Sequence, residues 1–400
     1  MLIQNAKILD MTGAAPYVGD ILIRDGRIVQ IGTSLQEMPE EETIDASGLW
    51  ALPGFVDAHT HQGGFDMIDQ NGMDLNEMTD PITPQVRAID GCNPLDKNFQ
   101  SVVSAGVTTL CVTPGSGNVI CGQAFVTKSV GNDIHKMAIK NPCALKIALG
   151  MNPKGVYGGK GKAPMTRMGI AALLDETFAK AQSYRLEKEE AYKTGKKMPD
   201  YNEKYEAMIP ALEGKIPLKI HCEQFDMMTA IEIAKKYHCH LTIEHAWSAK
   251  DFLNELKNSN ADINYGPVGV PTGFGELTGA DLLDAVLLDQ KGVNVSLISD
   301  SPILSEDILL IQAGEVVRYG AAPERALRMI TINPAKALGV DHRVGSLEIG
   351  KDGDIVLFDG MPAQDVAAKL QYTIIEGKIV YCAGKGAEID ERYNPSSVTY

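Results

Sequence analysis

Several features that would mark other classes of protein are missing from this chain of 400 residues. It has no apolar run long enough to cross a bilayer, and residues 1–7 lack both the basic end and the apolar stretch of a secretory signal. Positive charge is in deficit, because 37 basic residues stand against 52 acidic ones, for a net charge of −15. We therefore expect a cytoplasmic protein without a nucleic-acid or membrane partner, since both need a positive surface.

Two motifs are also absent. None of the seven scattered cysteines forms a CxxC pair, so reduced thiols are expected. No GxGxxG phosphate loop follows any of the strands expected below, which argues against a dinucleotide-binding sheet. What is present is ordinary for a globular protein, with 44% hydrophobic and 22% charged residues. The length predicts one large α/β domain with an accessory domain.

The two ends of the chain look like parts of one small β domain. Residues 21–30 place an Asp-Gly pair between two β-rich runs, which is a strong hairpin signal. Residues 354–358 and 372–381 have the composition of further strands. Neither end has enough strands to be stable alone. We therefore predict a small β-sandwich domain formed by residues 1–50 and 340–400.

Between these ends, short apolar runs alternate with helical segments, as in βα units with a parallel sheet. This pattern predicts a (β/α)8 TIM barrel over residues 51–339, with the chemistry at the carboxyl ends of its strands. The expected strands are 52–58, 107–112, 123–128, 144–149, 217–222, 240–246, 261–265 and 293–299. One charged helical stretch, from Thr166 to about Leu212, interrupts the alternation, either as a solvated extension or as a lid or dimer contact.

Polar side chains gather at the expected strand ends. His59 and His61 close the first strand, and residues two apart on a strand point to the same face. A bare pair of this kind could equally be two histidines on a surface loop. However, His221, His245 and Asp300 end the fifth, sixth and eighth strands. Because these ends meet at one mouth of the barrel, and imidazoles and carboxylates are common metal ligands, the set predicts a metal site.

These residues make the chain resemble the amidohydrolase superfamily. The resemblance is carried by Pro53–His61, by His221, His245 and Asp300, and by the tail segments Thr331–Gly339 and Gly345–Val356. Within the superfamily the chain is most similar to the imidazolonepropionase-related branch, which also holds prolidase-like dipeptidases. The resemblance implies a barrel with one or two divalent metals, zinc foremost with iron or manganese as alternatives, and a metal-activated water that attacks a carbon.

The resemblance narrows the reaction to cleavage of a C–N bond in an amide or cyclic amide. In it, Asp300 would take the proton of the water and hand it to the leaving nitrogen. His245 would bind a second metal or donate a hydrogen bond to the developing oxyanion. Lys146 on the fourth strand is the candidate for a carboxylated lysine that bridges two metals, although a structural lysine in a salt bridge is the alternative. A single metal held by His59, His61, His221 and Asp300 is somewhat favoured.

Two other functions remain open. A deaminase of a heterocyclic substrate would typically carry a glutamate three residues after His221, where this chain has Gln224. A non-catalytic scaffold with the amidohydrolase fold would have no need to retain all five ligand-type residues. Both alternatives are therefore less favoured than the hydrolase.

Residues that contact a small-molecule substrate are expected on the loops after the strands. Asn118 follows the second strand, Tyr157 follows the fourth, and Arg167 offers a planar fork for a substrate carboxylate. An ordinary surface role is the alternative for each. We also predict that Lys219 lies inside the barrel beneath the metal, paired with an acid such as Asp57. Assembly into a homo-oligomer is left open by the sequence.

Overall fold

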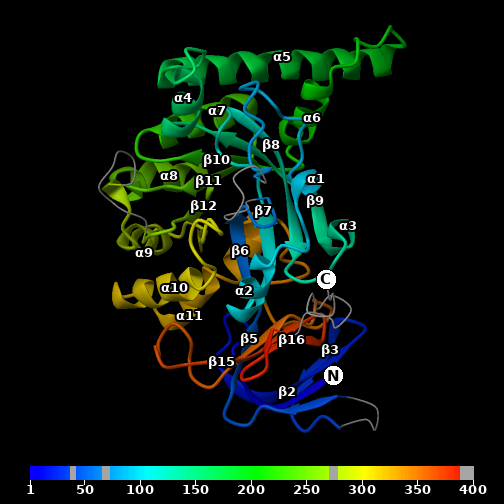
Figure 1. The fold of residues 1–400 in the computed structure, drawn as a ribbon, viewed down its shortest axis with the longest axis vertical. Coiled ribbons are helices and arrows are strands. Elements are labelled where there is room, and N and C mark those ends of the chain that lie inside the picture. The colour runs from blue at the N-terminus through cyan, green and yellow to red at the C-terminus, as the bar shows by residue number, and fades with distance from the viewer. Residues whose placement is uncertain (37–41, 65–72, 270–277, 388–400) are drawn as a thin grey trace, which may run out of the picture.

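The computed structural model describes residues 1–36, 42–64, 73–269 and 278–387, so residues 388–400 of the expected terminal domain lie outside the described part. In that part, strands from both ends of the chain join in one nine-stranded sheet (Figure 1). The order is β17-β16-β15-β14-β5-β1-β2-β3, with β4 paired to β1. The two ends meet where β5 and β14 pair antiparallel, with Pro53 opposite Ile355.

The strands of this terminal sheet are β1 (Leu2–Ile8), β2 (Tyr17–Arg24), β3 (Arg27–Gly32), β4 (Thr43–Asp45), β5 (Trp50–Pro53), β14 (Ile355–Phe358), β15 (Leu370–Ile375), β16 (Lys378–Cys382) and β17 (Gly386–Ala387). The expected hairpin between residues 21 and 30 is present as the antiparallel pair β2–β3, and Gly26 adopts φ +76° in its turn. Whether this sheet divides into the two layers of a sandwich, and the domain boundaries themselves, stay predictions.

A second sheet of eight strands forms a nearly closed barrel, in the order β13-β12-β11-β10-β9-β8-β7-β6. Each expected segment overlaps one of its strands, although β6, β8 and β9 extend beyond the expected bounds. The strands are β6 (Phe55–Thr60), β7 (Val107–Val112), β8 (Ile120–Lys128), β9 (Ala138–Ala148), β10 (Leu218–Cys222), β11 (Leu241–His245), β12 (Asp262–Tyr265) and β13 (Val295–Leu297). The two edges are joined by the amide of Asp300, which donates to the His59 carbonyl at 3.2 Å, and by the amide of His61, which donates to the Ser301 carbonyl at 2.6 Å.

The barrel departs from the expected all-parallel pattern at its third strand. β8 runs antiparallel to both of its neighbours, β7 and β9. A parallel strand needs a crossover of a dozen or more residues, whereas only residues 113–119 separate β7 from β8. The short connection therefore returns the chain along the neighbouring strand, and it lies at the same end of the barrel as the carboxyl ends of the parallel strands.

Helices cover the outside of the barrel. They are α1 (Ala88–Gly91), α2 (Asn98–Ser104), α3 (Ile134–Met137), α4 (Met151–Gly158), α5 (Arg167–Thr194), α6 (Glu203–Leu212), α7 (Asp226–Tyr237), α8 (Leu253–Ser259), α9 (Leu283–Gln290), α10 (Ile308–Arg318), α11 (Pro323–Arg328) and α12 (Ile332–Ala337), with a 3-10 helix over Ala249–Phe252. The main apolar core lies between these helices and the barrel strands. No helix in the described ranges combines the length and the hydrophobicity needed to cross a membrane.

The expected helical extension is two helices rather than one. α5 begins after Thr166, whose hydroxyl accepts the amide of Gly169 at 3.0 Å, and ends at Gly195, which has φ +71°. α6 then packs back against α5, where Tyr184 donates to Glu206 at 2.6 Å. In Figure 1, α5 lies at the end of the molecule opposite the terminal sheet and extends past the barrel. The roles of lid and dimer contact stay predictions.

A buried ion pair ties the barrel to the terminal sheet. Lys128, the last residue of β8, places its Nζ atom 2.7 Å from Asp352 and 2.6 Å from Asp354, just before β14. Replacing Lys128 with Met would leave the two buried carboxylates without this charge, so we expect the free energy of unfolding to fall by about 3–5 kcal/mol. Denaturant unfolding of the purified variant measures this loss.

The matched control is Lys136→Met, because the Lys136 side chain is exposed and pairs only with Asp133 on the surface. We expect this variant to stay within about 0.5 kcal/mol of the unmodified protein. Equal stability of the two variants would contradict a structural role for the Lys128 pair.

Candidate functional site

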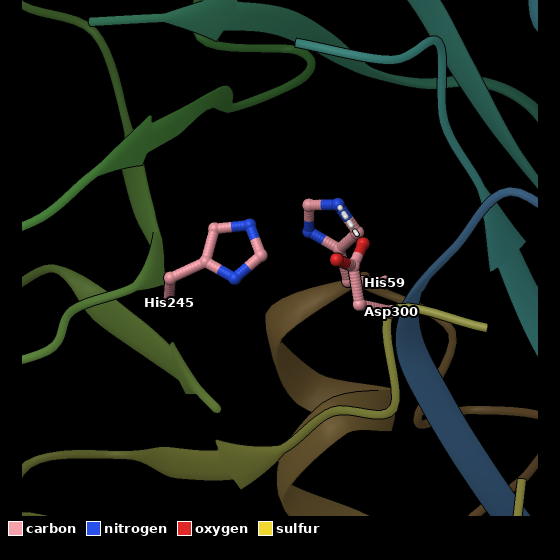
Figure 2. Close-up of side chains that lie close together, drawn as sticks. All are labelled: His59, His245 and Asp300. Carbon is pink, nitrogen blue, oxygen red and sulfur yellow. Dashed lines mark ion pairs between the residues drawn. The ribbon is translucent and has the colours of Figure 1, made fainter. Parts of the chain in front are cut away.

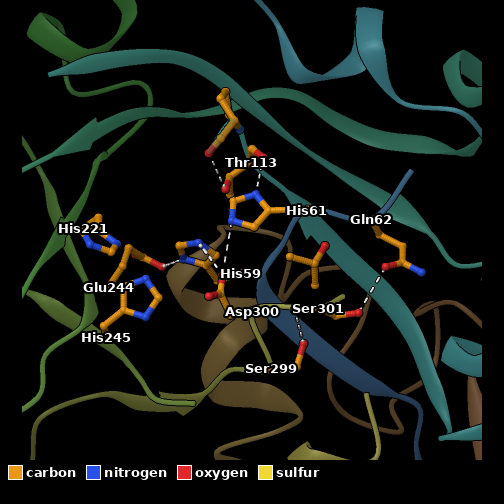
Figure 3. Close-up of polar contacts among 12 residues, drawn as sticks. His59, His61, Gln62, Thr113, His221, Glu244, His245, Ser299, Asp300 and Ser301 are labelled. Carbon is orange, nitrogen blue, oxygen red and sulfur yellow. Dashed lines mark hydrogen bonds and ion pairs between the residues drawn. The ribbon is translucent and has the colours of Figure 1, made fainter. Parts of the chain in front are cut away.

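The five expected metal ligands lie together at one mouth of the barrel (Figure 3). His59 is on β6 and His61 directly follows that strand, while His221 and His245 are on β10 and β11. Asp300 follows β13 by three residues. His59 is fully buried, and the Asp300 side chain keeps 19% of its surface exposed. The site is therefore enclosed but still open to a small molecule.

Three of these side chains are close enough to share one ion. Figure 2 shows His59, His245 and Asp300 facing a common space. One ligand atom from each lies within 4.8 Å of the other two. His61 joins this group from the side, with its Nε2 atom 3.2 Å from Asp300 Oδ1.

Hydrogen bonds at the far side of each ring orient three of the histidines. The Nδ1 atom of His59 lies 2.7 Å from Glu244 Oε2, that of His61 lies 2.9 Å from the Thr113 carbonyl, and that of His245 lies 2.8 Å from the Gly266 carbonyl. A ring whose Nδ1 donates to an oxygen presents the lone pair of Nε2 to the opposite side. This arrangement fits a divalent metal, and the mixed imidazole and carboxylate donors suit zinc, iron or manganese.

Electrostatics support the same set of donors. Burial acts to raise the pKa of Asp300, but the neighbouring His61, whose Nε2 atom lies 3.2 Å from Oδ1, lowers it to about 2. Burial, followed by the neighbouring His221, lowers the pKa of His245 to about 4. At neutral pH the carboxylate is therefore ionised and this imidazole is neutral, which are the forms that bind metals.

His221 lies beside the cluster, with its ring 4.4 Å from that of His245. Its Nε2 atom is 3.2 Å from Asn152 Nδ2 and 3.0 Å from Glu223 Oε1. The structure thus brings His221 to the mouth, but turns its ring nitrogen toward these two neighbours. Its role as a ligand stays a prediction.

Lys146 is brought to the cluster by β9. Its side chain is fully buried, and Nζ lies 3.1 Å from His59 Nε2. Burial lowers the pKa of Lys146, which favours the neutral amine. The neutral amine is also the form that reacts with CO2, so the surroundings suit the bridging role without demonstrating it.

The sequence analysis missed Glu244, which organises the floor of the site. Its Oε2 atom is 2.7 Å from both His59 Nδ1 and Lys219 Nζ, and its Oε1 atom accepts from Thr242 and Asn264. The register of the strands could have identified Glu244 as a site residue. Glu244 on β11 is paired with His221 on β10, so the two side chains lie on the same face of the sheet. Strand parity alone would turn His245 the other way, but this residue adopts φ +71°.

Lys219 is buried inside the barrel as expected, but Asp57 as its partner is wrong. The partner is Glu244, which lies on the strand next to that of Lys219. Asp57 is instead satisfied by backbone amides, since its carboxylate accepts from the amide of His59 at 2.9 Å and from that of Ser299 at 3.1 Å. These two bonds hold β6 against the segment that carries Asp300.

The three residues expected to contact substrate have hydrogen-bond partners within the protein. Tyr157 donates to Asn118 at 2.6 Å, and both side chains are buried. The side-chain amide of Asn118 also donates to the Thr83 hydroxyl at 2.7 Å. The Tyr157 hydroxyl and the Asn118 side chain therefore both have hydrogen-bond partners within the protein. Arg167 is bound to Asp226 at 2.7 Å. A direct contact of any of them with substrate stays untested.

A cavity of about 270 Å³ opens onto the histidines and Asp300. Its other described walls come from residues 75–78, from the loop between β7 and β8, from α4 and from the segment after Asp300. The polar side chains in these walls are Asn76, Ser116 and Asn152. The sequence analysis did not select them, because asparagine and serine in loops carry no motif that distinguishes a ligand contact from a turn.

Comparisons with known proteins agree with this geometry. The chain matches the amidohydrolase family over residues 50–380. The amidohydrolase tasK of Hapsidospora irregularis is 30% identical over 90% of this chain, which spans only 40% of the length of that relative. An imidazolonepropionase of Acinetobacter baumannii (strain AB307-0294) is 26% identical, over 89% of this chain and 92% of the relative.

Among solved structures, an amidohydrolase from Thermotoga maritima MSB8 is 36% identical to this chain. The superposition has a TM-score of 0.90 and covers 95% of this chain and 99% of that one. The expected resemblance, including its imidazolonepropionase-related side, is therefore confirmed. The chain belongs to the amidohydrolase family.

Proposed function

We propose that this protein is a metal-dependent hydrolase that cleaves the C–N bond of an amide or cyclic amide. Membership of the amidohydrolase family supports the assignment to the hydrolases. The observation that carries the metal-dependent part is the orientation of His59, His61 and His245, whose Nδ1 atoms all face oxygen acceptors. Their Nε2 atoms are thereby directed toward the ionised carboxylate of Asp300, at the edge of a cavity of small-molecule size.

A divalent metal, zinc first and iron or manganese as alternatives, would polarise the substrate carbonyl and lower the pKa of the attacking water. We assign His59, His61, His245 and Asp300 as the residues that would hold one or two such ions, with His221 as a further ligand after a turn of its ring and Lys146 as the bridge in a two-ion site. The low pKa of His245, and the lone pair left on its Nε2 atom, favour the ligand role over donation to an oxyanion.

Asp300 performs the proton transfers in this proposal. One carboxylate oxygen accepts the proton of the attacking water, and the same residue then delivers it to the leaving nitrogen. Its position supports this role, because one oxygen contacts His61 while the side chain borders the cavity. Glu244 and Lys219 keep His59 in place beneath it.

Lys146 is proposed to bridge a second metal after carboxylation by CO2. The 3.1 Å contact with His59 Nε2, and the burial that lowers the pKa of the Lys146 amine, support this role over that of a lysine in a salt bridge. A deaminase is the second candidate function, because the buried acid Glu223 lies 3.0 Å from His221 even though Gln224 occupies the position three residues beyond it.

The metal content of the purified protein tests the ligand set. We expect about two ions per chain by elemental analysis when the protein is prepared without chelators and with bicarbonate. Lys146→Met should lower this to about one, because the bridging carboxylate is lost, and His59→Asn should lower it further.

Matched controls exist for both variants. Lys140→Met changes a lysine of the same strand that donates to the Leu338 carbonyl, and His342→Asn changes an exposed histidine. Both should retain the full metal content. Unmodified protein that stays free of metal after loading with Zn²⁺ or Mn²⁺ would refute the proposed site.

The general base is tested by Asp300→Asn. Loss of the proton acceptor should reduce kcat by about 10²–10⁴-fold with a much smaller change in KM. The assay uses the best substrate from a panel of N-acetylated amino acid amides and cyclic amides, with the metal content measured in the same sample. A variant that retains both metal and kcat would show that another group moves the proton.

A further inference from the structure

The walls of the cavity next to the cluster are mostly apolar and electrically neutral away from the metal ligands. Four aliphatic or thioether side chains line it, namely Leu75, Met78, Val156 and Ile303. The polar side chains between them are the amides of Asn76 and Asn152 and the hydroxyl of Ser116. The volume of about 270 Å³ is just below the range of small-molecule sites, which span about 300–1,000 Å³.

We propose that this cavity selects small amide substrates whose groups beside the scissile bond are uncharged, and that it discriminates against substrates bearing a carboxylate there. This inference rests on the proposed hydrolase function and concerns only its specificity. A substrate carboxylate that is recognised by a protein is normally paired with the fork of an arginine or with a lysine.

Three basic side chains in the described part of the chain have partners of their own. Among the described residues that line it, none is a lysine or arginine. Arg167 is bound to Asp226, Lys160 donates to the backbone carbonyl of Met78, and Lys146 contacts His59.

The energetic consequence follows from the chemistry of the walls. An ionised carboxylate held against Leu75, Val156 and Ile303 would lose hydration without gaining a countercharge from these walls, which is costly. A neutral amide or an aliphatic group loses far less hydration. Asn152, whose Nδ2 atom lies 3.2 Å from His221, can exchange hydrogen bonds with a neutral polar group at the metal end of the cavity.

Two pairs of compounds, each a terminal amide and the matching carboxylate, test the specificity, and only cleavage of the acetyl or ring amide that both members share is counted. N-acetyl-leucinamide is compared with N-acetyl-leucine, and pyroglutamamide with pyroglutamate, on the metal-loaded full-length protein. We expect kcat/KM to be at least tenfold higher for the neutral member of whichever pair is hydrolysed. Calorimetric titration of all four compounds gives a binding preference that does not depend on turnover.

A charge introduced into the wall should reverse the preference. Met78→Arg places a guanidinium at a lining position that is 40% exposed, so the ratio of carboxylate to amide binding should rise at least tenfold. Met198→Arg is the matched control, because Met198 is 46% exposed in the linker between α5 and α6 and does not line the cavity. Its ratio should equal that of the unmodified protein.

The outcomes separate this inference from the proposed function. Equal or stronger use of the carboxylates would overturn the neutral-substrate inference and leave the hydrolase intact. Binding of the neutral compounds without hydrolysis of any of the four would support the inference and overturn the proposed reaction for these classes. An unchanged binding ratio in Met78→Arg, or no binding of any compound, would overturn the inference.

Discussion

The buried carboxylate of Glu244 is the interaction on which the geometry of the site depends. An ionised carboxylate in a barrel interior is expensive unless it is paired and fully hydrogen-bonded. Here one oxygen faces Lys219 and His59, and the other accepts from Thr242 and Asn264. The charge is thus compensated by groups on three neighbouring strands, and through His59 on a fourth across the barrel. The hydrogen bond with Glu244 also holds His59 in one tautomer, with Nε2 facing the cluster.

The hydrogen bonds that close the barrel also position Asp300, the proposed base. The amide of Asp300 donates to the His59 carbonyl, and Asp57 accepts the amides of both His59 and Ser299. These bonds join β6 to the segment after β13, so Asp300 lies beside the histidines only when the barrel has closed. His245 and Asp300 both adopt left-handed backbone conformations, with φ of +71° and +57°. Such conformations are uncommon for residues other than glycine, and they are frequent where function requires a particular side-chain direction.

Charge is distributed unevenly around the cavity. The described lining combines the groups proposed to hold a metal with aliphatic side chains and neutral amides. The proposed ligands are suited to a reaction at a carbonyl, and the aliphatic and amide walls decide which groups the substrate can carry on either side of it. The family assignment and the geometry of the proposed ligands thus support the type of reaction, and the lining of the cavity supports the substrate preference.

The sequence by itself determined the strand positions and the ligand types. Apolar runs of strand length, each followed by His or Asp, placed His59, His61, His221, His245 and Asp300 at one mouth, because carboxyl ends of parallel strands meet there. Tertiary structure decided the reversed direction of β8, the pairing of Lys219 with Glu244 instead of Asp57, and the burial of Asn118 against Tyr157. These outcomes depend on which side chains face each other across strands and loops distant in sequence, and local patterns do not encode that proximity. Only the folded barrel shows that the described walls of the cavity, apart from the proposed ligands, are formed by neutral side chains.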